Sequence, residues 1–152
     1  MNPSEAGMAF PVLGFTPNGD IWGFPDLDTL TSCGPRTLKD DLQIGMELVD
    51  ADGRRWVVRS VERLGRGEPL LQWLVSAVLS TRQSRIVQEL ESLAPLSLEE
   101  IRERTCAAVA RDPWVYADDD PDLLQARLAE IRGAPSVAAI HEMLGLDSFM
   151  AY

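Results

Sequence analysis

Short apolar runs separated by turn residues occupy the first part of the chain. Residues 10–24 read FPVLGF-TPNG-DIWGF, and the Asn-Gly pair ending at Gly19 supplies the positive φ angles of a tight turn. Residues 46–64 repeat this arrangement around an Asp-Gly pair ending at Gly53, and their second run is rich in β-branched valine. The pattern predicts two β-hairpins, preceded by a polar and frayed start over residues 1–9.

The middle of the chain allows more than one interpretation. Residues 25–34 have the composition of a connector, and Pro35 suits the first turn of a short helix over 35–43. Residues 69–81 and 84–93 are apolar at helical spacing, but they are also short enough for buried strands. Strands are favoured for parts of both segments, because a sheet of two hairpins alone would bury little surface.

The last part of the chain, residues 97–145, has the periodicity of helices. Ser97 and Glu100 form a capping box, which predicts a helix start. Three helices are expected, with N-caps at Ser97, Asp120 and Ser136 and with ends at Asp112, Gly133 and Gly145. Strands first and helices last are typical of an α+β fold.

The length and these patterns together predict one domain over residues 1–152. Residues 10–93 are expected to be mainly β with one short helix, and residues 97–145 to be helical. The predicted architecture is an antiparallel sheet of about four to six strands, built from the N-terminal hairpins and packed with three C-terminal helices.

Charge divides the chain into three parts. Residues 1–53 carry 2 basic and 9 acidic groups (net −7), 54–85 carry 7 and 2 (net +5), and 86–152 carry 5 and 13 (net −8), which together give −10. An acidic field repels nucleic acid and anionic lipid and attracts basic partners. No apolar run approaches the ~20 residues that cross a bilayer, and the first residues do not resemble a signal peptide. We therefore expect a cytoplasmic monomer or weak homodimer that binds neither nucleic acid nor membranes.

Residues with catalytic or metal-binding chemistry are sparse. The single histidine, His141, has no nucleophile in a recognisable setting beside it, and one histidine excludes most zinc sites. Cys106 falls in the middle of a helix, where a thiol packs well, whereas Cys33 precedes a helix start and has a reactive role as its alternative. Two isolated cysteines indicate a reducing compartment, with one long-range disulfide as the alternative. No catalytic, cofactor-binding or metal-binding residue is assigned, and no cofactor is expected.

Two further charged motifs have simple structural interpretations. Asp50 and Asp52 resemble part of a calcium loop, but the chain lacks the ligands that would stand at its first and twelfth positions, which favours a turn. Arg55, Arg59 and Arg63 share one face of a strand. Pairing with acidic neighbours is favoured for them over an anion patch that binds nucleic acid.

The densest charge on the chain is Asp118-Asp119-Asp120-Pro121-Asp122. A solvated loop in which Asp120 caps a helix explains part of this run but leaves its first two residues unexplained. Aromatic side chains just before it complete the composition of a hot spot, the small set of residues that dominates binding energy, for a basic partner. The residues assigned to partner binding are Trp114, Tyr116, Asp118, Asp119 and Asp122.

In overall character the chain resembles the immunity proteins of bacterial toxin systems. The resemblance covers its small size, its acidity, its helical C-terminal part and the segment from Leu30 to Leu64 with the Asp-Gly hairpin. It implies a non-enzymatic bacterial protein whose acidic surface binds and neutralises a basic protein, the toxin. Two alternatives stay open. One is a structural or adaptor protein, and the other is a small enzyme with an acid/base pair drawn from Asp26, Asp28, Asp50 and Asp52.

Overall fold

The computed structural model of the protein describes residues 1–33, 43–63 and 84–145. In these parts the strands are β1 (Val12–Phe15), β2 (Ile21–Phe24), β3 (Ser32–Cys33), β4 (Glu47–Val49), β5 (Arg55–Arg63) and β6 (Ser84–Leu93). The helices are α1 (Pro3–Ala6), α2 (Leu27–Leu30), α5 (Leu98–Arg111), α6 (Pro113–Ala117), α7 (Pro121–Arg132) and α8 (Val137–Leu144). The strands pair antiparallel in the order β2-β1-β4-β5-β6-β3, which confirms the predicted α+β fold.

Both predicted hairpins are present. Gly19 (φ +86°) turns the chain between β1 and β2, and Gly53 (φ +84°) turns it between β4 and β5. The segment 84–93, which the sequence left open between helix and strand, is β6 and pairs with β5 from Arg55 opposite Leu93 onward. Residues 35–42 of the helix predicted over 35–43 lie outside the described residues, and so does the segment 69–81.

The start of the chain is folded, contrary to the expectation that it is frayed. Asn2 and Glu5 make a capping box at α1, and Pro3 is buried. The amino group of Met1 forms an ion pair with Glu89 on β6. A helix of four residues is too short to show a periodic pattern, so its signals were the capping box, Pro3 in the first turn and Gly7 at the C-cap. The connector over 25–34 likewise contains α2 and β3.

The C-terminal part contains four helices in the described residues rather than three. Asp112 ends α5 as predicted, but Pro113 also occupies the first turn of a further helix, α6. Proline suits that position because its missing N–H would have no partner there in any case. The N-caps of the other helices are as predicted: the side chains of Ser97, Asp120 and Ser136 each accept a hydrogen bond from a backbone N–H of the first turn.

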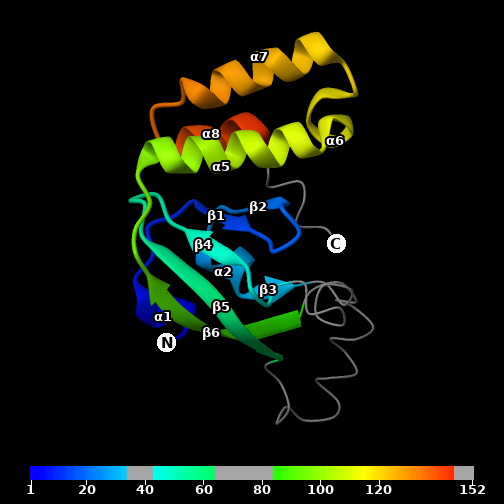
Figure 1. Ribbon diagram of the computed structural model, residues 1–152. Coiled ribbons are helices and arrows are strands. Elements are labelled where there is room, and N and C mark those ends of the chain that lie inside the picture. The colour runs from blue at the N-terminus through cyan, green and yellow to red at the C-terminus, as the bar shows by residue number, and fades with distance from the viewer. Residues whose placement is uncertain (34–42, 64–83, 146–152) are drawn as a thin grey trace.

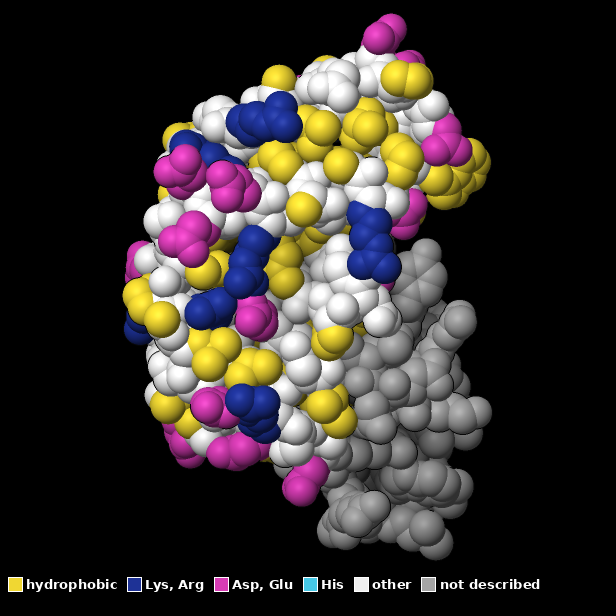
Figure 2. Space-filling view, in the orientation of Figure 1, with side chains coloured by type: hydrophobic (Ala, Val, Ile, Leu, Met, Phe, Trp, Pro, Cys, Tyr) yellow, Lys and Arg dark blue, Asp and Glu magenta, His cyan; other side chains and the backbone are white. Residues whose placement is uncertain are grey.

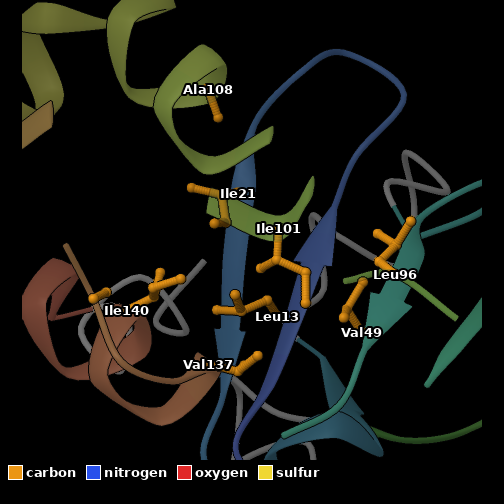
Figure 3. Packing of buried hydrophobic residues seen from close by; sticks show 9 residues of the cluster. Leu13, Ile21, Val49, Leu96, Ile101, Ala108, Val137 and Ile140 are labelled. Atoms are coloured by element: carbon orange, nitrogen blue, oxygen red, sulfur yellow. The ribbon is translucent and has the colours of Figure 1, made fainter. Parts of the chain in front are cut away.

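The elements form layers, with α5 and α8 over one face of the sheet and α7 above them (Figure 1). Figure 3 shows the apolar cluster between these helices and the sheet, which includes Leu13 and Val49 of the sheet, Ile101 of α5 and Ile140 of α8. A second apolar cluster, which includes Phe24, Met46 and Leu90, is separate from this one. A third cluster joins α5 to α7 through Cys106, Val109, Leu128 and Ile131.

Candidate functional site

The best candidate for a functional surface lies on α6 and the turn that follows it. Trp114 is 69% exposed and Val115 is 43% exposed, although both are large and apolar. Asp118, Asp119 and Asp122 follow them and are also exposed. We call these five residues the α6 patch. At the α6 end of the helical layer, hydrophobic and acidic side chains lie next to one another on the surface (Figure 2).

The backbone presents the two aspartates of the turn in an uncommon conformation. Asp118 (φ 49°) and Asp119 (φ 55°) are both left-handed, a region in which few residues other than glycine lie. The N–H groups of Asp119 and Asp120 donate to the carbonyls of Pro113 and Ala117, at 3.1 and 2.8 Å, and so close the end of α6. Among the described residues, no basic group forms an ion pair with the carboxylates of the α6 patch.

Tyr116 was predicted to bind the partner together with Trp114, but it lies on the inner side of α6. Its ring packs against the cluster between helices and sheet and against the cluster between α5 and α7. Burial, helped by the nearby charges of Asp20 and Asp112, raises the pKa of its phenol to about 12. Positions 114 and 116 are two residues apart, which places them about 200° apart around a helix. Val115 takes the place of Tyr116 as the second exposed apolar residue of the patch.

Comparison with protein-family models, with curated proteins and with solved structures finds no match to this chain.

The arginines of β5 pair with acidic neighbours, as the sequence indicated. Arg55 lies 3.5 Å from Glu47 on β4, and Arg59 donates to Glu91 on β6. The side chain of Arg63 lies outside the described residues. The paired arginines hold neighbouring strands together, because each contact crosses from one strand to the next.

Asp50 is wholly buried and holds the turn between β4 and β5. One carboxylate oxygen accepts from the N–H groups of Asp52 and Arg54, at 3.0 and 2.9 Å. The other accepts from the N–H of Ala9 at 3.1 Å and from Nε of Arg54 at 3.0 Å. This confirms a turn in place of a calcium loop. The same hydrogen bonds engage one of the four carboxylates from which the enzyme alternative would draw its acid/base pair.

A second carboxylate of the enzyme alternative, Asp26, caps α2. Its side chain accepts from the N–H and from the hydroxyl of Thr29, each at 2.7 Å. These hydrogen bonds lower the pKa of Asp26. A general acid at neutral pH needs the opposite shift.

Two further candidate side chains, those of Cys106 and His141, lie in the core. Cys106 is a free, buried thiol, and burial raises its pKa. His141 is buried on α8. The side chain of Cys33 is outside the described residues. Within those residues no group of three or more His, Cys, Asp or Glu side chains is placed to hold a metal ion. In the same residues, no helix has the length and apolar character needed to span a membrane.

Proposed function

We propose that the protein is a non-enzymatic binding protein of the immunity type, which holds a basic partner on the α6 patch. The observation that carries the proposal is the exposure of Trp114 at 69% beside three exposed carboxylates. A partner that buries a tryptophan gains a large apolar contact, and Trp is among the residues most enriched in hot spots. A lysine or arginine of the partner can reach the carboxylates at the rim.

The charges of the α6 patch would act mainly on the rate of association. Carboxylates at the rim of an interface steer an oppositely charged partner, and salt weakens this effect. The net charge of −10 adds a longer-range attraction of the same sign. The indole of Trp114 would instead act on dissociation, because its contact exists only in the complex.

The proposal is tested on a partner captured from the native lysate and then purified. We expect a basic protein that is harmful to the cell when this protein is absent. The dissociation constant is measured at several salt concentrations by calorimetry, and the association rate by surface plasmon resonance. Trp114→Ala should weaken binding by about thirtyfold or more, as for a hot-spot residue. The double substitution Asp118→Asn with Asp119→Asn should slow association and flatten the salt dependence.

The matched control removes two acidic charges elsewhere. Glu99 and Glu103 are exposed on α5 and make no ion pair in the described part of the chain. Glu99 and Glu103 lie about 18 and about 12 Å along the helix from Arg111, where α5 ends. Glu99→Gln with Glu103→Gln should leave most of the association rate intact. Equal effects of the two double substitutions would show that net charge alone, and not the α6 patch, attracts the partner.

A further inference from the structure

A groove of about 380 Å³ lies between α5 and the turn that joins β1 to β2. Its apolar lining comes from Phe15, Ala107 and Ala108, and its charged lining from Asp20, Arg104 and Arg111. The groove is open to solvent on one side, so it would hold a small molecule by a few apolar and charged contacts and would not enclose it. In Figure 2, basic side chains lie on both sides of hydrophobic ones in the seam between the helical layer and the sheet.

Arg104 is a fixed wall of the groove. Its Nη1 donates to Glu47, a carboxylate that also lies 3.5 Å from Arg55. Its guanidinium lies over the ring of Phe15, with 6.0 Å between the guanidinium carbon and the ring centre. Arg104 therefore shares the carboxylate of Glu47 with Arg55, and its position is held from two sides.

Arg111 carries an uncompensated charge at the other end of the groove. It is exposed, and within the described residues no carboxylate lies within ion-pair distance of it. Its guanidinium lies against Gly19, where an added Cβ would stand 1.9 Å from Nη1. The glycine that turns the hairpin thus also leaves the space that the guanidinium occupies.

Asp20 supplies an opposite charge next to that glycine. Its N–H donates to Oγ1 of Thr16 at 3.0 Å, which fixes the backbone at the end of the turn. Its carboxylate is exposed and, among the described residues, forms no ion pair with Arg111 or any other cation. Among the described residues, the groove therefore presents an arginine and an aspartate that no ion pair engages, next to an apolar lining.

We propose that this groove binds a small zwitterion of the α-amino acid class with an apolar side chain. The ligand carboxylate pairs with Arg111, its ammonium group pairs with Asp20, and its side chain lies on Phe15 and Ala107. A ligand with a carboxylate alone would be attracted by Arg111 but repelled by Asp20. A ligand with an ammonium group alone would be attracted by Asp20 but repelled by Arg111. The proposal uses none of the five residues of the α6 patch, so it stands or falls separately from the binding of a protein partner.

The test is a titration of the whole protein with three probes, followed by amide NMR shifts and calorimetry. L-Phenylalanine carries both charges, hydrocinnamate lacks the amine, and phenethylamine lacks the carboxylate. We expect L-phenylalanine to give saturable shifts around Phe15 and Gly19 and to bind at least tenfold more tightly than either of the others. The absence of saturation at up to about 10 mM L-phenylalanine overturns the proposal. Equal binding of hydrocinnamate or phenethylamine overturns it as well.

Variants then assign the two charges. Arg111→Gln and Asp20→Asn should each weaken L-phenylalanine binding about tenfold or more, since each removes a charge-assisted hydrogen bond. The matched control is Arg132→Gln, because Arg132 is an exposed arginine in the last turn of α7 just as Arg111 is in α5. It should bind like the parent. Circular dichroism confirms that each variant is folded, and a folded Arg111→Gln that binds like the parent contradicts the assignment.

Discussion

Asp50 shows how one side chain can stabilise two distant parts of the chain. Its carboxylate is fully buried and accepts from Ala9 near the N-terminus as well as from the turn at 50–54. Sequence patterns indicated the turn but not the burial, because an aspartate before Asp-Gly is usually a surface residue. The hydrogen bonds that make burial tolerable come partly from residue 9, which no local pattern connects to residue 50.

We expect Asp50→Asn to lower the free energy of unfolding by about 2–4 kcal/mol, since each buried donor left unsatisfied costs about 1–3 kcal/mol. The amide NH₂ would face N–H donors in place of an acceptor. Asp52→Asn is the matched control, because Asp52 makes only a long contact of 3.9 Å to Arg54 and should change stability by less than about 0.5 kcal/mol. Urea denaturation measures both, and equal effects would contradict the role given to Asp50.

The raised pKa of Tyr116 predicts how the stability of the protein changes at alkaline pH. Its pKa is raised to about 12, chiefly by burial, from an ordinary value of 10.0. A pKa raised in the folded state contributes stability that is fully present below the unfolded value, and this contribution is lost as the pH rises from about 10 to about 12. The phenolate absorbance of Tyr116 is the difference between the parent and the variant Tyr116→Phe. In the folded protein this difference should appear with a midpoint near pH 12. A midpoint near 10 in folded protein would show that the ring is solvated.

At the scale of elements, the helices and strands that the sequence predicted are those marked by signals within a few residues of the chain. The Asn-Gly and Asp-Gly turns and the caps Ser97, Asp120 and Ser136 act within a few residues, so their elements could be located. α1 and α6, with four and five residues, are too short for periodicity and went unpredicted. Trp114 and Tyr116 were predicted to bind one partner because both precede the acidic run, but a helix points the two side chains apart.

Within the acidic run, Asp120 has a structural role as the N-cap of α7, whereas Asp118, Asp119 and Asp122 are proposed to bind the partner. Oδ1 of Asp120 accepts from the N–H groups of Asp122 and Leu123, at 2.9 and 3.4 Å. Asp120→Ala should cost about 0.5–2 kcal/mol of stability through the lost cap. Asp119→Asn keeps a residue that tolerates the left-handed region and should be nearly neutral. Thermal unfolding followed by circular dichroism compares the two variants. An unchanged stability of Asp120→Ala would contradict the capping role given to Asp120.

At the scale of the whole molecule, stability depends on the contact between the helical layer and the sheet. Ile101 is 1% exposed at the centre of this contact. Ile101→Ala should lower the free energy of unfolding by about 2–5 kcal/mol, the range for truncating a buried aliphatic residue. Val115→Ala, at a site 43% exposed on the α6 patch, should change it by less than about 0.5 kcal/mol. Similar losses in the two variants, measured by urea denaturation, would contradict this division between core and patch.

The order of the layers along the chain has a consequence for biosynthesis. Leu13, Ile21 and Val49 are translated before the helices α5 and α8 that cover them. About 90 residues separate Val49 from α8. At about 5–20 residues per second, the ribosome needs roughly 4 to 18 s to add them. α5 is translated within that interval and α8 only at its end, so part of the apolar face stays uncovered on the nascent chain until α8 follows. We therefore expect the nascent chain to be a client for chaperones that bind exposed hydrophobic segments.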